Sequence, residues 1–511
     1  MSGLFEKLRY NISGQLVARL SSFLINMYLL RIVDASVIGL VNVRLMLLYD
    51  TILFLTREPM RKSPLLKSSL EQFINLIWLS PLISTVLSIL IVPFWMSFSS
   101  TPLSIPVVLS FASSAIIESF AEPFCIISLR FSLDYHFGLS QGLLILLKRL
   151  FVLLFILSST VDHISLFCYA QVIAAISFVV FHVLSFYRYI GQQRNELQQF
   201  NSFRDFFPRF SYGIDKSSAS TVRTLLFHSV LKQALTDGSS FVMTFTQLLT
   251  LPQQGVYDAI ERLGSLFSRM FLAPLEESSF AYFSNVVNSS HGQNKSEKER
   301  LREVVETFGS LLHDLVVCGL IVCTFGVPYS SIAVKLYGGQ LLVQNGGAYL
   351  LATYAVYVMI TAINGVTEGF AFATMNRGDV LSHSGFLILA AIGHLSLSFC
   401  LCSLYGAVGF ILANMINMLI RIVYSWRHIS HFLEESRPSI SRLSPSFSTV
   451  FQLLFVFGGC CISQLLFGST PGISHTLANL AVGAVLFIVV IIQIFHQEQL
   501  FHHLLKGEKQ R

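Results

Sequence analysis

Charged side chains are scarce in this sequence of 511 residues, since lysine, arginine, aspartate and glutamate together make up 12% of it. A soluble globular domain carries about 25%. Hydrophobic residues make up 53% of the chain, and its mean hydropathy is +0.65. These values argue against a soluble enzyme or a nucleic-acid-binding protein. They indicate a membrane protein, whose spans are helices because a helix satisfies its own backbone in lipid.

Several motifs are also missing. No G-x-x-x-x-G-K-[ST] sequence occurs, so we expect no ATP-driven motor of that kind. The eight cysteines include a C-x-C and a C-C pair without a spaced second pair, and we expect them to be small buried hydrophobes. We therefore expect no metal and no cofactor. The N-terminal segment lacks the short uninterrupted apolar core of a signal peptide, so we expect the first span to be retained.

Long apolar segments recur along the whole chain. A membrane span takes roughly 20 apolar residues, and the length and spacing of these segments predict an all-α polytopic protein of about 14 transmembrane helices. We place the spans near residues 12–33, 38–57, 72–97, 103–125, 138–158, 165–186, 223–249, 256–285, 303–325, 346–373, 380–403, 406–426, 448–467 and 476–495. The polar stretches between them are too short to form a soluble catalytic domain.

The basic residues orient these predicted spans. If the N-terminus is cytosolic, 23 of the 34 lysines and arginines fall in segments on the cytosolic side, and Lys335 alone falls on the other side. Because cytosolic loops are enriched in lysine and arginine, this asymmetry predicts cytosolic N- and C-termini and an even number of spans.

The chain also shows signs of an internal duplication. Gly39 opens a predicted span that ends in Arg57, Glu58 and Pro59, and Gly255 opens one that ends in Pro274, Glu276 and Glu277. An offset of six spans keeps both halves in the same orientation. We therefore predict two six-helix bundles around a central cavity, in residues 1–222 and 223–430, followed by two extra helices in 431–511.

Ten basic residues remain inside or at the edges of the predicted spans. They are Arg19, Arg31, Arg44, Lys148, Arg149, Arg223, Lys232, Arg262, Arg269 and Arg421. Each costs roughly 2.5 to 3.5 kcal/mol at a helix centre that faces lipid, so we expect most of them to face a hydrated cavity or an acidic partner. Pairing within the membrane explains part of this set, and Asp258 with Arg262 at i, i+4 is one such case. Acids in the spans are fewer than bases, however, and the surplus of positive charge favours an anionic ligand such as a pyrophosphate.

Helical spacing shows how these polar residues share faces. Stripes with i, i+4, i+7, i+11 spacing are Gln15, Arg19, Ser22 and Asn26; Asp258, Arg262, Ser265 and Arg269; and Tyr357, Thr361, Asn364 and Glu368. Shorter stripes are Asn414, Asn417 and Arg421; Gln141 and Lys148; and Glu118 and Glu122. Because such stripes occur in both halves, they are typical of a polar cavity between two bundles.

Several stretches resemble the eukaryotic Rft-type oligosaccharide-translocation proteins. They are VNVRLMLLYDTILFLTREPMR (41–61), LKQALTDGSSFVMTF (231–245), QGVYDAIERLGSLFSRMFLAPLEES (254–278), LYGG (336–339), INGVTEGFAFATM (363–375) and GAVGFILANMINMLIRI (406–422). The resemblance covers about residues 15 to 425 and is specific.

This resemblance implies the fold of the multidrug, oligosaccharidyl-lipid and polysaccharide exporter superfamily. It further implies a role in N-linked glycosylation at the endoplasmic reticulum membrane, where members pass dolichyl-pyrophosphate-linked mannose oligosaccharide from the cytosolic to the lumenal leaflet. With membrane lipids, that molecule is the expected partner. The residues expected to line the cavity, from polar stripes and motif positions together, are Arg19, Arg44, Arg57, Arg61, Lys148, Arg262, Arg269, Asn364, Glu368, Asn414, Asn417 and Arg421. The acids expected to have structural or gating roles are Glu58, Glu118, Glu122, Asp258, Glu276 and Glu277.

Three other functions are compatible with a polytopic membrane protein. A membrane glycosyltransferase needs acids in a lumenal loop, whereas the first such loop, 33–37, contains only Asp34, so we expect no enzyme. A proton- or sodium-coupled exporter would use Glu118, Glu122 and Glu368 as coupling acids. A non-transporting scaffold of the same glycosylation pathway remains a further alternative.

Overall fold

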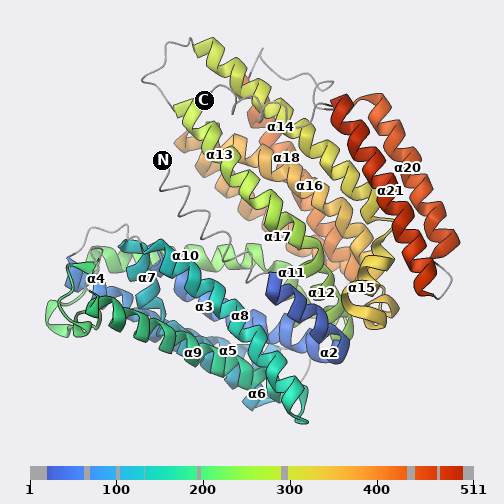
Figure 1. Ribbon diagram of the computed structural model, residues 1–511. Coiled ribbons are helices and arrows are strands. Elements are labelled where there is room, and N and C mark those ends of the chain that lie inside the picture. The colour runs from blue at the N-terminus through green and yellow to red at the C-terminus, as the bar shows by residue number, and fades with distance from the viewer. Residues whose placement is uncertain are drawn as a thin grey trace. The chain divides into compact units, whose positions relative to one another are not determined.

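The computed structural model describes residues 20–62, 69–98, 104–131, 133–192, 197–288, 297–433, 444–468 and 472–498. Every regular element in these ranges is a helix (Figure 1). Eleven of the described helices are long and apolar enough to cross a membrane. The prediction of an all-α polytopic membrane protein is therefore confirmed, whereas the total of about 14 spans, inferred from segment length, stays a prediction.

Three predicted spans are not among the eleven. The described part of the first is the shorter apolar helix Leu20–Ile32. The other two, near 223–249 and 256–285, are broken into several helices. They are also less apolar, since the first carries Arg223 and Lys232 and the second carries Asp258, Glu261 and Arg262.

The chain packs into two compact units, Met1–Gly255 and Val256–Arg511. Residues 223–255 belong to the first unit because helix α10 (Lys216–Thr236) packs along α3 (Met46–Met60). The first unit contains the helix Leu20–Ile32, α2 (Ala35–Ile38), η1 (Gly39–Leu45), α3, α4 (Leu70–Ile77), α5 (Leu79–Phe98), α6 (Ile105–Ser119), α7 (Glu122–Arg130), α8 (Asp134–Ser158), α9 (His163–Gly191), η4 (Phe203–Phe206), η5 (Phe210–Tyr212), α10, α11 (Gly238–Phe245) and the start of α12 (Leu251–Phe267).

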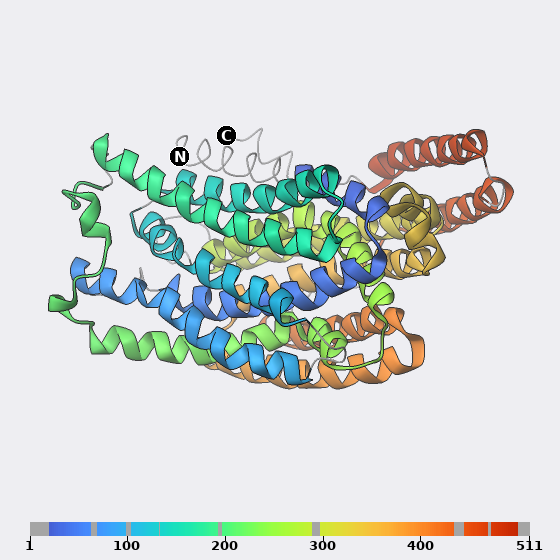
Figure 2. The same cartoon turned by 90° about the horizontal axis from the view of Figure 1, so that it is seen from below.

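Helix α3 is central in this unit, since it packs against α5, α6 and α10, while α9 packs against α6 and α8. The two long helices α8 and α9 run side by side (Figure 2). The core at one end of the unit is aromatic and includes Phe73, Phe124, Phe186 and Phe206. In contrast, α5 exposes Ile89 and Leu90, at 67% and 65%. An exposed apolar face of this kind suits contact with lipid rather than water.

The second unit is built around α16. It contains the rest of α12, η6 (Ser268–Leu272), α13 (Ala273–Asn288), α14 (Glu297–Gly326), α15 (Ser330–Gln344), α16 (Gly347–Thr374), α17 (Arg377–Tyr405), α18 (Ala407–Leu433), α20 (Phe447–Phe467) and α21 (Ile473–Glu498). Helix α16 packs against α13, α14, α15 and α18, and α17 packs against α18. The last two helices form the hairpin drawn in red in Figures 1 and 2, and α20 packs against α14.

Two short segments, η1 and η6, are π-helical, with backbone hydrogen bonds that span five residues where those of an α-helix span four. Around η1 the backbone of α2 comes very close to that of α12. A Cβ atom on Gly39 would lie 2.0 Å from the carbonyl oxygen of Leu251, and one on Gly255 would lie 2.4 Å from that of Ala35. Because real Cβ atoms do not approach so closely, this crossing requires glycine on both helices.

Candidate functional site

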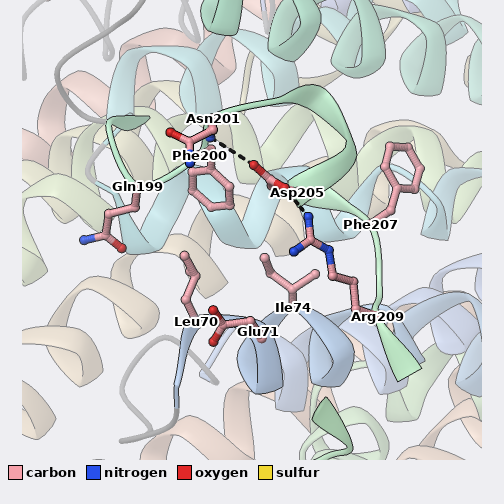
Figure 3. Close-up of a pocket in the computed structure, with 9 residues that line it drawn as sticks. All are labelled: Leu70, Glu71, Ile74, Gln199, Phe200, Asn201, Asp205, Phe207 and Arg209. Atoms are coloured by element: carbon pink, nitrogen blue, oxygen red, sulfur yellow. Dashed lines mark hydrogen bonds and ion pairs between the residues drawn. The ribbon is translucent and has the colours of Figure 1, made fainter. Parts of the chain in front are cut away.

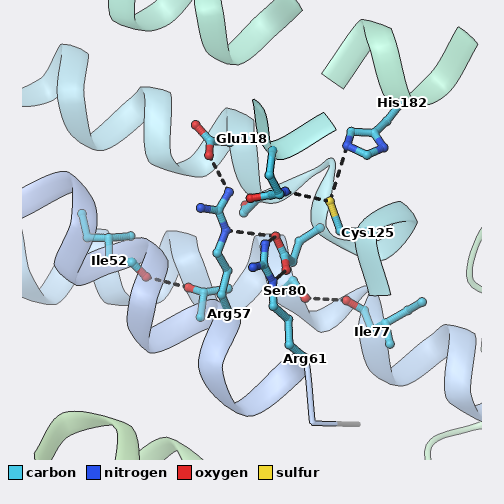
Figure 4. A network of polar contacts seen from close by, with 12 residues as sticks. Ile52, Arg57, Arg61, Ile77, Ser80, Glu118, Cys125 and His182 are labelled. Atoms are coloured by element: carbon cyan, nitrogen blue, oxygen red, sulfur yellow. Dashed lines mark hydrogen bonds and ion pairs between the residues drawn. The ribbon is translucent and has the colours of Figure 1, made fainter. Parts of the chain in front are cut away.

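A buried network of charged residues lies in the first unit, between α3, α6, α7 and α8 (Figure 4). Arg57 on α3 donates to Glu118 on α6 at 2.5 Å and to Glu122 at the start of α7 at 2.9 Å. Arg61, one turn after Arg57, forms a second ion pair with Glu122. Lys148 on α8 lies 3.2 Å from Glu118.

Tyr49 completes this network. Its hydroxyl donates to Glu118 and accepts from Lys148, and the Lys148 ammonium lies 4.1 Å from the centre of the Tyr49 ring. The side chains of both glutamates are fully buried, and those of the three bases are mostly buried. The paired residues come from α3, α6, α7 and α8, so the network connects four helices. Loss of one member would leave its partner buried with an uncompensated charge, which is strongly destabilising.

Arg44 is held differently. It lies within η1, is 1% exposed, and donates from Nε to the side-chain oxygen of Gln254 on α12 at 3.0 Å. Gln254 in turn donates to the backbone oxygens of Met243 and Leu249, at 3.1 and 2.9 Å. Arg44 is therefore packed into the interior of the first unit in this conformation.

The second unit contains a groove of about 610 Å³ between α13, α16 and α18. Its lining residues are Glu276, Phe280, Thr361, Asn364, Gly365, Glu368, Gly369, Phe372, Met418 and Arg421. Arg421 forms an ion pair with Glu368, which also accepts from Asn364 at 3.0 Å. The Nε2 atom of His383 on α17 lies 3.4 Å from Glu368. The stripe predicted on α16 and Arg421 thus lie together along one groove.

Two polar atoms of these groove residues are buried without a hydrogen-bond partner in the described part of the protein. They are the Oδ1 acceptor of Asn364 and the Nε–H donor of Arg421. A buried polar group left without a partner costs about 1–3 kcal/mol. A hydroxyl group both donates and accepts, so it is chemically suited to bond with either atom.

The remaining predicted residues lie elsewhere. Arg262 donates to both carboxylate oxygens of Asp258, at 2.9 and 2.8 Å, so the intrahelical pair considered from the sequence is formed. Glu58 pairs with Lys62 at 3.0 Å and with Lys232 at 2.8 Å. Asn414 and Asn417 are half-buried on α18 and are not among the groove residues. Arg19 and the side chains of Arg269 and Glu277 lie outside the described residues.

The sequence did not indicate several residues that the structure brings to these sites. A buried chain of contacts runs from Tyr189 through His136 and His182 to Cys125, with distances of 3.1, 3.1 and 3.4 Å. Two of its members, Cys125 and His182, are seen in Figure 4 beside the network that contains Arg57, Arg61 and Glu118. The four residues of this chain of contacts come from three helices, so no local pattern marks them. Gly365 and Gly369 in the groove of the second unit could have been found from the sequence. They lie one turn apart, and small residues at i, i+4 mark close helix packing in membranes.

A second, smaller groove of about 160 Å³ lies where the linker 197–215 covers α4 (Figure 3). Three charged side chains line it, and two of them, Asp205 and Arg209, pair with each other, while the third is Glu71. Trp78 donates to the Phe206 carbonyl at 2.7 Å, which fixes the linker to the helices. At the linker's end, hydrogen bonds from the Ser218 hydroxyl and backbone lower the pKa of Asp215. This groove results from linker packing, and we assign it no ligand.

Comparison with known proteins identifies the family. The sequence profile of the Rft protein family matches residues 4–507. This chain belongs to the Rft family. The family resemblance inferred from the sequence is therefore confirmed, and it extends beyond residue 425 into the C-terminal helices. Among relatives of this Rft protein, the Man(5)GlcNAc(2)-PP-dolichol translocation protein RFT1 of Caenorhabditis elegans is 48% identical over 98% of this chain and 97% of its own length. The protein of that name from Xenopus tropicalis is 31% identical over 98% and 95%.

The fold of this Rft protein is similar to that of known transporters. The lipid II flippase MurJ, in an inward closed conformation, superimposes with a TM-score of 0.65 over 96% of this chain and 99% of its own, at 13% identity. An inward-facing multidrug resistance MATE family transporter of the MOP superfamily gives 0.54 over 84% and 96%, also at 13% identity. Identity this low establishes the fold alone, and the predicted exporter-superfamily fold is confirmed.

Proposed function

We propose that this Rft protein translocates dolichyl-pyrophosphate-linked mannose oligosaccharide across the endoplasmic reticulum membrane, from the cytosolic to the lumenal leaflet, in N-linked glycosylation. It acts as a transporter and not as an enzyme. The names of its relatives support this substrate class, since they are described as Man(5)GlcNAc(2)-PP-dolichol translocation proteins. The transporter fold supports the mode of action.

The groove in the second unit carries the proposal. Its lining residues Asn364 and Arg421 each hold one buried polar atom without a partner, Oδ1 and Nε–H, and Glu368 lines the same groove. Sugar hydroxyls donate to the first and third of these groups and accept from the second. Phe280 and Phe372 add apolar ring faces that match the C–H faces of a sugar. With two carboxylates beside one guanidinium, this groove suits the oligosaccharide better than the pyrophosphate.

The pyrophosphate remains assigned to the other basic residues predicted from the sequence, among them Arg44 and Arg262. In this conformation Arg44 donates to Gln254, and Arg262 to Asp258. Binding of an anion by either arginine therefore requires an exchange of partner during the transport cycle. Such exchange suits a transporter, which must bind its substrate in one state and release it in another.

The buried network in the first unit argues against a cation-coupled exporter. A coupling acid has to exchange a proton or a sodium ion during each cycle. Two of the three acids expected to serve that purpose, Glu118 and Glu122, are instead held by Arg57, Arg61 and Lys148. The third, Glu368, is paired with Arg421. Because the sequence contains no G-x-x-x-x-G-K-[ST] motif, the lipid-linked oligosaccharide has to move down its own concentration gradient between the leaflets. Consumption of this molecule in the lumen maintains that gradient.

The decisive experiment is a leaflet-transfer assay. The purified full-length protein is reconstituted into vesicles with a defined dolichyl-pyrophosphate oligosaccharide, and the fraction in each leaflet is followed over time without ATP. We expect the wild type to accelerate transfer, and Asn364→Ala to reduce the rate roughly tenfold, the loss of one to two hydrogen bonds. Ser396→Ala, on an exposed face of α17 outside the groove, is the matched control.

Absence of transfer by a correctly folded wild-type protein would overturn the proposal. If removal of the protein from cells nevertheless lowered N-glycan occupancy, its contribution to glycosylation would be that of a non-transporting scaffold. Equal rates for wild type and Asn364→Ala would separate transport from this groove.

A further inference from the structure

A surface that is polar at one end and apolar at the other lies between α17 and α18. It shares no lining residue with the groove that contains Asn364 and Arg421, which is called the sugar groove below. A polar pocket of about 610 Å³ lies where α17 begins and α18 approaches its end, and its lining residues are Thr374, Met375, Asn376, Asp379, Ser382, Tyr424, Arg427, His428, His431 and Phe432. An apolar groove of about 350 Å³ continues from it, lined by Phe386, Ile416, Leu419, Ile420, Val423, Tyr424 and Arg427. Tyr424 and Arg427 belong to both, so the pocket and the groove are contiguous.

Both helices change from polar to apolar in the same direction along this surface. On α18, Ile416, Ile420, Val423, Arg427 and His431 follow one another at intervals of three or four residues. They therefore share one face, which is apolar at one end and basic at the other. On α17, Asp379, Ser382 and Phe386 make the same transition in reverse chain order. This change from polar to apolar surface matches a lipid, which has a polar head group at one end and an apolar chain at the other.

An aromatic pair marks the boundary between the two parts. The rings of Phe386 and Tyr424 are stacked, with centroids 3.9 Å apart and an interplanar angle of 9°. On the apolar side, Leu419, Ile420 and Val423 are 47%, 47% and 55% exposed. Aromatic residues at the junction of apolar and polar surface are typical of the membrane interface. The pocket is therefore placed where lipid head groups lie.

The charges in the pocket select the kind of head group. Arg427 supplies one positive charge and Asp379 one negative charge, beside the imidazole rings of His428 and His431. A diphosphate, with more than one negative charge, is poorly matched by this balance. A zwitterionic phospholipid is matched, because its phosphodiester carries one negative charge and its amine one positive charge.

The oxygen atoms near Asp379 narrow the choice further. Asn376 and Ser382 line the pocket with the Asp379 carboxylate, and together they can accept the three N–H donors of a primary ammonium. A choline has no such donors. We propose that α17 and α18 bind phosphatidylethanolamine, with its phosphate on Arg427 and the neighbouring histidines, its ammonium on Asp379, and one acyl chain in the apolar groove.

Native mass spectrometry of the delipidated full-length protein tests this site. The protein is titrated separately with phosphatidylethanolamine, phosphatidylcholine, phosphatidylglycerol and dolichyl diphosphate of known concentration. We expect the wild type to retain one phosphatidylethanolamine in preference to the other three. Arg427→Ala should weaken that binding roughly tenfold, the loss of one charged hydrogen bond, and Arg427→Lys should weaken it less. Arg188→Ala, at the exposed end of α9, is the matched control and should bind as the wild type does.

A change of preference provides the sharpest test. Asp379→Asn removes the negative charge from the pocket while keeping a similar shape, so preference should shift from phosphatidylethanolamine to the anionic phosphatidylglycerol. The proposal is overturned if the wild type binds phosphatidylcholine, phosphatidylglycerol or dolichyl diphosphate as tightly as phosphatidylethanolamine. Unchanged affinity in a folded Arg427→Ala protein would also overturn it. If that variant does not fold, the wild-type preference and the Asp379→Asn shift decide the matter.

Discussion

Gly39 and Gly255 lie against each other, with 2.9 Å between the backbone nitrogen of each and the position that a Cβ atom on the other would occupy. Each glycine also meets the carbonyl oxygen of the residue four positions before the other glycine, since Leu251 faces Gly39 and Ala35 faces Gly255. The crossing is therefore reciprocal. These are the two glycines whose similar surroundings in the sequence predicted an internal duplication.

Replacing Gly39 with alanine should destabilise the protein. The new methyl group would overlap the Leu251 backbone, which cannot move without shifting α12, and overpacking of this kind costs about 1–3 kcal/mol. We expect a lower midpoint of thermal unfolding and lower abundance in cells. Gly393→Ala on α17 is the control, because nothing beyond the adjacent backbone of its own helix lies within 4 Å of its Cβ position. A Gly39→Ala protein as stable as the control would contradict this account of the crossing.

Glu122 should be essential for stability. Its removal strands Arg61 and leaves Arg57 with Glu118 alone, and breaking a buried ion pair costs about 3–5 kcal/mol. Thermal unfolding of purified Glu122→Ala measures this loss. Lys62→Ala removes an ion pair to Glu58 whose lysine side chain is 48% exposed, and its cost should stay below about 1 kcal/mol. Similar losses for the two variants would show that the network contributes little.

Gly365→Ala should alter the sugar groove without unfolding the protein. A methyl group there would lie 1.8 Å from the Oε1 atom of Glu276, the mobile end of a side chain, so the carboxylate must move. Gly369→Ala, one turn along α16, would bring its methyl group to 3.9 Å from Phe280, an ordinary contact. In the leaflet-transfer assay, corrected for folded protein, we expect the first variant to lose more rate than the second. The reverse order would argue against a role for Glu276.

The predicted orientation can be tested with introduced cysteines. Ser211 in the linker should face the cytosol, and Tyr349, which is 78% exposed at the start of α16, should face the lumen. Each is changed to cysteine in a Cys400→Ser background, since Cys400 is an exposed native thiol. A membrane-impermeant maleimide added to sealed microsomes should label Ser211→Cys, and should label Tyr349→Cys only after the membrane is opened. The opposite pattern would invert the topology.

The sequence was informative wherever the relevant pattern lay within one helix. The i, i+4 pair of Asp258 and Arg262, and the stripe that carries Asn364 and Glu368, follow from helical periodicity alone. The placement of Arg421 beside Glu368 did not follow, because the two lie 53 residues apart on different helices. Only packing of α16 against α18 brings them together.

Charge counting had a similar limit. A surplus of bases in the spans predicted cavity-lining residues, but the count could not assign partners. Arg57 pairs with acids more than 60 residues away. Arg44 binds a neutral amide, Gln254, which no count of charges includes. The prediction of the number of spans was limited by the two charged segments near 223–249 and 256–285. Where these helices lie is determined by the helices packed around them and not by their own hydropathy.

The π-helical turn of η1 fixes the rotational phase of the span that contains it. Gly39, the first residue of this segment, lies against the backbone of α12, and Arg57, beyond its end, pairs with the two glutamates. A single residue accounts for about 100° of rotation in a helix. Deleting one residue within Gly39–Leu45 would therefore turn either the glycine or the arginine away from its partner. The number of residues between Gly39 and Arg57 is thus as strictly constrained as the identity of either residue. With one residue fewer, this span could keep the contact with α12 or the pairing with the glutamates, but not both.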